Sequence, residues 1–145
     1  MNGKPVGESI VPLPFTVSGT VVRGKQLGSR LGFPTANIRY DVQRGSWPAN
    51  GVYAGLACLD DRLYLCVLNQ GMHPTSPEGM PTVEAHLLDY TGGELYGQQI
   101  TLEYLCYLRP EKTFPSLEAL KEQLGQDLQS ARLWAEQNRP ALQKA

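Results

Sequence analysis

Hydrophobic and polar positions alternate with a period of two over much of the first two thirds of the chain. This alternation, or a short apolar run, covers five segments that we predict to be strands: residues 15–22, 51–59, 62–68, 82–89 and 97–108. Only Asp60 and Asp61 separate the second segment from the third, which is the length of a tight hairpin turn. These two strands should therefore pair antiparallel.

The pattern changes to a helical period near the C-terminal end. Apolar residues recur there at three- and four-residue steps and define one stripe, made of Leu117, Leu120, Leu124, Leu128, Ala131 and Trp134. Ser116 can cap this helix, Glu118 suits the positive end of its dipole, and Pro140 limits its far end. Several short strands followed by one helix favour a mainly β fold, an antiparallel barrel with the C-terminal helix packed outside.

The domain organisation follows from length and local composition. A chain of 145 residues fits one domain with one core. Residues 1–14 are rich in Pro, Gly and polar side chains, so we expect a flexible N-terminal arm. The barrel domain with its helix should occupy residues 15–138, and residues 139–145 should form a tail.

Composition and charge exclude several classes of function. The chain is 41% hydrophobic and 19% charged, and its formal net charge of -1 gives no basic excess to attract a nucleic acid. No stretch approaches the roughly 18 apolar residues that span a bilayer, and no basic segment with an apolar run opens the chain. We therefore expect a cytoplasmic protein with no nucleic-acid and no membrane partner.

A glycine-punctuated segment runs from Gly24 through Gly28 and Gly32 to Pro34. Glycines let the backbone approach a ligand closely and aim N–H groups at phosphate oxygens. The chain has no GxxxxGK[ST] and no βαβ context, so this is not the common phosphate loop. Spacing alone leaves a second interpretation open, in which the glycines serve turns between strands and Pro34 ends the loop.

Thr35 and Asn37 stand two residues apart directly after this segment. In an extended backbone they project to the same side. Mg²⁺ prefers such oxygen ligands and binds through few protein groups together with nucleotide phosphates. The alternative is that both side chains bond the local backbone in a turn.

A second polar pair lies in the predicted strand at 82–89. Period-two geometry puts Glu84 and His86 on one face, while the residues between and beside them, Val83, Ala85 and Leu87, point to the other. A carboxylate within reach of a substrate hydroxyl could accept its proton during phosphoryl transfer. The alternative is an ordinary solvated strand face.

The connection between the last predicted strand and the helix mixes two cations with an aromatic ring. Phe114 could lie against a flat ring system, and Arg109 or Lys112 could bond its polar edge. The alternative is a solvated rim at the start of the helix.

Together these segments resemble the riboflavin kinases, or flavokinases, found alone or as the C-terminal half of bacterial bifunctional FAD synthetases. The resemblance runs from about Phe15 to Trp134. It rests on Gly19, Val21, Gly24, Leu31-Gly32-Phe33-Pro34-Thr35-Ala36-Asn37, Gly51-Val52-Tyr53, Glu84-Ala85-His86-Leu87-Leu88-Asp89-Tyr90, Leu95-Tyr96-Gly97, Leu108-Arg109-Pro110-Glu111-Lys112, Phe114, Asp127 and Ala131.

The resemblance implies a six-stranded Greek-key barrel that transfers the γ-phosphoryl group of ATP to the 5′-hydroxyl of riboflavin to give FMN. It implies that Thr35 and Asn37 hold Mg²⁺, with Zn²⁺ or Mn²⁺ as alternatives, and that Glu84 is the catalytic carboxylate. The nucleotide would be bound by Gly24, Ser29, Arg30, Gly32, Pro34, Thr35, Leu87 and Tyr96, and the flavin by Arg109, Lys112 and Phe114. We expect a monomer whose small-molecule partners are riboflavin or FMN and ATP or ADP.

Two other functions compete with this one. The same barrel could be a non-catalytic module that binds flavin for sensing or storage, or a flavin reductase-type domain that uses a hydride donor. The sequence before Phe15 resembles no nucleotidyltransferase, so we do not expect this chain alone to convert FMN to FAD. The kinase interpretation requires Thr35, Asn37 and Glu84 to meet in space.

Overall fold

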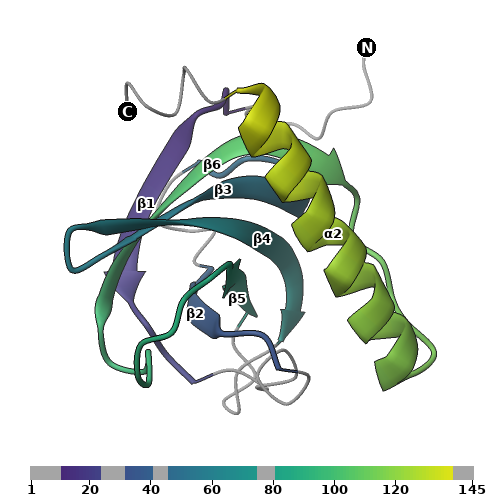
Figure 1. Ribbon diagram of the computed structural model, residues 1–145, viewed down its shortest axis with the longest axis horizontal. Helices are drawn as coiled ribbons and strands as arrows, with labels where there is room; N and C mark the ends of the chain where they lie inside the picture. The colour runs from purple at the N-terminus through teal and green to yellow at the C-terminus, as the bar shows by residue number, and fades with distance from the viewer. Residues whose placement is uncertain (1–10, 24–31, 41–45, 75–80, 139–145) are drawn as a thin grey trace.

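The computed structural model describes residues 11–23, 32–40, 46–74 and 81–138, without the side chains of 72–74 and 81. Its elements are β1 (Phe15–Thr20), β2 (Thr35–Arg39), β3 (Gly51–Leu59), β4 (Arg62–Pro74), β5 (Pro81–Leu87), β6 (Gln99–Arg109) and α2 (Leu117–Gln137). The strands form one antiparallel sheet in the order β1-β6-β3-β4-β5-β2. Figure 1 shows this sheet curling around a central space, with α2 along its outside.

The strand order contains a Greek key. Strands β3, β4 and β5 follow one another, and β6 returns to pair with β3, which is the arrangement that defines this motif. The outer strands β1 and β2 approach through a bridge just beyond β1, where the Val22 N–H donates to Asn37 O at 2.7 Å. The predicted mainly β architecture is confirmed, with a barrel that is only partly closed at this seam.

The interior of the curled sheet is a hydrophobic core. Its fully buried members include Leu68, Val83, Leu102 and Tyr104. One buried polar side chain, Gln70, accepts the Tyr104 hydroxyl at 2.7 Å and donates to Pro48 O at 2.7 Å. Because its polar atoms are satisfied, Gln70 joins the segment before β3 to the barrel wall at little cost.

Helix α2 begins as the sequence predicts. The Ser116 side chain accepts the Ala119 N–H at 3.1 Å, so the predicted N-cap is confirmed. Ala131 packs with Val52 and Val67 in a second apolar cluster on the outer surface of the sheet. This packing places α2 over β3 and β4, outside the barrel.

Two strands differ from the periodicity-based prediction. We predicted no strand at β2, although Ala36 and Ile38 alternate with polar residues, because the run is only five residues long and directly follows the Gly- and Pro-containing segment. Strand β4 continues past the expected end at 68, because Gln70 is a core residue despite its polarity. The predicted hairpin is confirmed, with Asp60 and Asp61 both at positive φ, as a type I′ turn requires.

Candidate active site

The residues predicted to hold a metal and to accept a proton lie side by side on the sheet. In the strand register Asn37 of β2 is directly opposite Glu84 of β5, and Thr35 is opposite His86. Side chains at such positions have Cβ atoms about 4.5–5.5 Å apart. The alternating residues Val83 and Ala85 fill the core, so this polar group lies on the outer face, the face that also carries α2.

Local hydrogen bonds orient the two neutral oxygen groups. The Thr35 hydroxyl donates to Phe33 O at 2.9 Å and lies 3.0 Å from His86 Nδ1. Asn37 is 4% exposed, and its Oδ1 accepts the Thr82 hydroxyl at 3.3 Å. A hydroxyl or amide oxygen can accept two hydrogen bonds or ligands, so each oxygen keeps room for a further partner.

His86 is a buried neutral imidazole beside the carboxylate. It is 3% exposed, so the alternative of a solvated strand face is wrong for this residue. Burial lowers the pKa of His86 to about 4, although the nearby Asp127 carboxylate of α2 acts in the opposite direction. At neutral pH the 3.9 Å separation of His86 Nε2 and Glu84 Oε1 is therefore not an ion pair. The imidazole therefore brings no positive charge to the Glu84 side chain.

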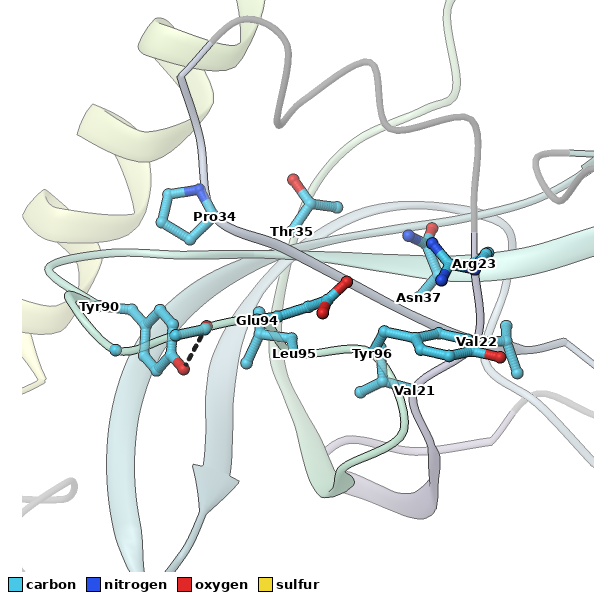
Figure 2. Close-up of a pocket in the computed structure, with 12 residues that line it drawn as sticks. Val21, Val22, Arg23, Pro34, Thr35, Asn37, Tyr90, Glu94, Leu95 and Tyr96 are labelled. Carbon is cyan, nitrogen blue, oxygen red and sulfur yellow. Dashed lines mark hydrogen bonds between the residues drawn. The ribbon is translucent and has the colours of Figure 1, made fainter.

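A pocket of about 380 Å³ lies beside β2. Its lining includes Pro34, Thr35 and Asn37 at β2, Arg23 just beyond β1, and Glu94 and Tyr96 from the segment before β6. Figure 2 shows the Arg23 guanidinium over the Tyr96 ring, 4.2 Å from the centroid, and the Glu94 carboxylate pointing into the space between Thr35 and Tyr96. Glu84 does not line this pocket, so Thr35 and Asn37 stand between the pocket and the carboxylate.

Of the residues predicted to bind nucleotide, Pro34, Thr35 and Tyr96 line the same pocket. Gly32 precedes them with φ +94, a left-handed backbone that favours glycine. Leu87 is instead a core residue, and its N–H donates to Pro34 O at 2.9 Å. The remaining three, Gly24, Ser29 and Arg30, lie outside the described residues.

The residues predicted to bind flavin gather at the end of β6. Arg109 Nε and Nη2 donate to the Asp127 carboxylate at 2.9 and 2.7 Å, and Nη1 donates to Pro110 O at 3.0 Å. Arg109 and Lys112 both lie near the Phe114 ring, at 5.9 and 5.7 Å from its centroid. Two of the five N–H groups of Arg109 thus fix α2 to the sheet.

The strand register connects this cluster to the acidic residue. Glu84 faces Asn69 of β4, Asn69 faces Val52 of β3, and Val52 faces Arg109 of β6. Arg109, one of the predicted flavin residues, and the predicted catalytic acid therefore belong to one row across the outer face. On the other side of Glu84 the row continues to Asn37 and the pocket.

Sequence reasoning did not assign roles to three charged residues of this region. Arg23 and Glu94 line the pocket, and neither belongs to a periodic pattern. Asp127 could have been found, because it lies three residues after Leu124 and four before Ala131, on the buried face of the helix. A carboxylate at such a position needs a partner, and Arg109 supplies it.

The donor set restricts the kind of metal that could bind. Among the residues with described positions, no group of three or more His, Cys, Asp or Glu side chains could hold a metal ion. A cation here would take the neutral oxygens of Thr35 and Asn37 with ligand oxygens, as Mg²⁺ does. No helix in the described part of the chain is long and apolar enough to cross a membrane.

Comparison with known sequence families shows to which family this chain belongs. The family described as "Flavokinase: Riboflavin kinase" matches residues 11–135. The chain belongs to the riboflavin kinase family. This membership and the site geometry come from separate observations.

Relatives of this riboflavin kinase family member are mostly longer proteins. The chain is 37% identical to the bifunctional riboflavin kinase/FMN adenylyltransferase of Pseudomonas fluorescens, over 90% of its own length and 41% of the relative. It is 40% identical to the RNA-binding riboflavin kinase RibR of Bacillus subtilis (strain 168), over 77% of its own length and 47% of that relative. The chain thus spans less than half of either protein.

Solved structures give the same fold. Riboflavin kinase from Trypanosoma brucei superposes with a TM-score of 0.62 and 26% identity, covering 90% of this chain and 81% of that one. A Streptococcus pneumoniae protein titled macrolide-efflux protein superposes with a TM-score of 0.69 and 28% identity, covering 82% of this chain and 38% of that one. The second likeness is confined to a part of a longer chain.

Proposed function

We propose that the protein is a riboflavin kinase, which transfers the γ-phosphoryl group of ATP to the 5′-hydroxyl of riboflavin and releases FMN and ADP. The observation that carries the proposal is the register of β2 and β5, which puts Asn37 opposite Glu84 with Thr35 beside them. This register brings two metal-binding oxygen groups and one proton acceptor to neighbouring positions on one face, and these are the groups that the reaction requires. Family membership and relatives named for this activity support the same conclusion.

The nucleotide would occupy the pocket beside β2, with its phosphates toward Thr35 and Asn37. Mg²⁺ would be held by these two side-chain oxygens, and it would neutralise charge on the transferring phosphoryl group. Neutral oxygens suit Mg²⁺ or Mn²⁺ better than Zn²⁺, which favours sulfur and nitrogen. Thr82 contributes by fixing the amide of Asn37.

Glu84 would accept the proton of the acceptor hydroxyl. As the riboflavin oxygen forms its bond to the γ-phosphorus, the bond from that phosphorus to the bridging oxygen breaks and ADP leaves. The hydroxyl proton passes to the Glu84 carboxylate and then to solvent.

The flavin would lie along the row from Glu84 toward Arg109. Phe114 offers a ring face, while Lys112 and the unused N–H groups of Arg109 can bond the polar edge of a flat ring system. In this arrangement the ribityl chain passes over Asn69 and brings its terminal hydroxyl to Glu84. We propose further that the protein acts as a cytoplasmic monomer, without a nucleic-acid or membrane partner.

One assay tests the activity. The protein is mixed with riboflavin, ATP and Mg²⁺, and FMN and ADP are measured by chromatography. Equal amounts of FMN and ADP are expected. Flavin binding without FMN production would replace the proposal with the non-catalytic flavin-binding module. If the protein neither bound flavin nor produced FMN, both functions would be rejected.

A further inference from the structure

The Thr35 hydroxyl has a single hydrogen, and its contacts decide where that hydrogen lies. The carbonyl oxygen of Phe33, 2.9 Å away, can only accept, so the hydroxyl must donate to it. His86 Nδ1 is 3.0 Å from the same oxygen. With the hydroxyl hydrogen already used, this second contact is a hydrogen bond only if Nδ1 carries the proton.

The surroundings of the imidazole agree with this tautomer. Nε2 faces Glu84 Oε1 at 3.9 Å, which is too long for a hydrogen bond. A buried ring needs at least one satisfied nitrogen, and the Thr35 oxygen is the acceptor that the described residues show at Nδ1. The proton therefore lies on Nδ1, and Nε2 carries a lone pair.

The consequence for Thr35 is a fixed hydroxyl. Its hydrogen is directed to Phe33 O and one lone pair accepts the imidazole N–H, so a single lone pair remains. Without these contacts the hydroxyl hydrogen could rotate about the Cβ–Oγ1 bond. The two hydrogen bonds select one orientation of the hydroxyl and keep the last lone pair for an external ligand.

We propose that His86 is a positioning residue, whose Nδ1–H holds the Thr35 hydroxyl in the one orientation that presents its remaining lone pair to the cation of a metal nucleotide. His86 touches neither the nucleotide nor the acceptor and acts only through Thr35. The inference rests on the proposed function, because it takes Thr35 to be a metal ligand. It assigns a role to His86, which would otherwise be only a buried neighbour of Thr35 and Glu84.

The tautomer is tested on the unaltered protein by nitrogen-15 NMR of the histidine rings. The signal of His86 is identified by its loss in His86→Asn, since the chain has only one other histidine, His73. The expected pattern is a protonated Nδ1 and an unprotonated Nε2. A ring protonated on Nε2 alone would overturn the proposal, whatever the enzyme's activity.

The coupling to the metal is tested by calorimetric titration of ADP with and without Mg²⁺. His86→Leu removes the donor, and the Mg²⁺-dependent gain in ADP affinity should fall roughly tenfold or more, the usual effect of losing a group that orients a metal ligand. Metal-free ADP binding should not change. His86→Asn keeps an N–H at the position of Nδ1 and should retain most of the gain.

A double variant separates positioning from a merely structural role. In a Thr35→Val background His86→Leu should have no further effect on the Mg²⁺-dependent gain, because the group through which His86 acts is absent. The proposal would be overturned if the two substitutions reduced the Mg²⁺-dependent gain in ADP affinity additively. It would also be overturned if His86→Leu alone kept the wild-type gain. If His86→Leu does not fold, His86→Asn and the NMR result still decide it, and absence of FMN from the wild-type assay would identify a failure of the proposed function instead.

Discussion

In the proposed site three side chains would carry the chemistry, and two of them are held by hydrogen bonds to neighbouring groups. Asn37 is fixed by Thr82, Thr35 by Phe33 and His86, and Glu84 stands opposite Asn37. Phosphoryl transfer needs little covalent help from a protein, and its rate depends on position and on neutralised charge. Changes at single residues should therefore separate binding from turnover.

Glu84→Gln should leave riboflavin binding close to wild type and lower kcat by about 10²-fold or more, because the amide cannot accept the hydroxyl proton. Flavin fluorescence titration measures binding, and FMN production measures kcat. Glu136→Gln, an exposed change on α2, is the control and should keep full activity. An unaltered kcat in Glu84→Gln would remove this residue from the proton-transfer step.

Thr35→Val replaces a hydroxyl with an apolar group of the same shape and should raise the Mg²⁺ concentration needed for half-maximal activity at fixed ATP. Thr35→Ser keeps the oxygen and should stay closer to wild type. Activity is followed over a Mg²⁺ titration for all three proteins. Identical metal dependence in the valine variant would show that Thr35 is not a ligand.

At the scale of elements, the site depends on the contact between β6 and α2. Arg109 ends β6, and its paired hydrogen bonds to Asp127 fix the helix over the outer face where Glu84 and His86 lie. Asp127 is 4% exposed, so this ion pair is far less screened than a surface pair. Helix position and site geometry are thus linked through one carboxylate.

Asp127→Ala leaves Arg109 largely buried without its carboxylate and should lower the free energy of unfolding by about 3 kcal/mol. Chemical denaturation measures the change. The control is Arg132→Gln, which breaks the exposed ion pair between Arg132 of the same helix and Asp89, a residue that follows β5. This change should have little effect on the free energy of unfolding. Equal stabilities of Asp127→Ala and wild type would contradict a structural role for the buried pair.

The elements also show where sequence patterns succeed. Strand β1 was predictable because its inward residues alternate with exposed ones, and α2 because Ser116 and the apolar stripe mark its start and buried face. Strand β2 was not, since it is only five residues long, directly follows the Gly- and Pro-containing segment, and its polar Asn37 is buried like its neighbours Ala36 and Ile38. The burial of His86 depends on a helix distant in sequence, which no local pattern encodes.

At the scale of the whole molecule, the site lies at the seam of a partly closed barrel. Strand β2 has β5 on one side and the Val22 bridge on the other, so Thr35 and Asn37 are shared between the pocket and the row that leads to Arg109. The residue identities and their family order were readable in the sequence. Their adjacency was not, because it depends on the pairing of β2 with β5, which are separated along the chain by residues 40–80.

The buried histidine should make the stability of the whole fold depend on pH. Burial lowers the pKa of His86 from 6.5 to about 4, so between these values the unfolded chain binds a proton that the native protein does not. Stability should therefore fall by up to about 3 kcal/mol as pH decreases from about 6.5 to 4. Urea denaturation at a series of pH values measures this, and His86→Asn, which does not titrate, should lack this component. Parallel pH profiles for the two proteins would refute it.

The most direct test of the shared site is a crystal structure with Mg²⁺, ADP and riboflavin bound together. The metal should lie about 2.1 Å from Thr35 Oγ1 and Asn37 Oδ1. The riboflavin 5′-oxygen should lie within about 3.2 Å of the Glu84 carboxylate. A metal held by other residues, or a 5′-hydroxyl out of reach of Glu84, would contradict the proposal that these three side chains form one phosphoryl-transfer site.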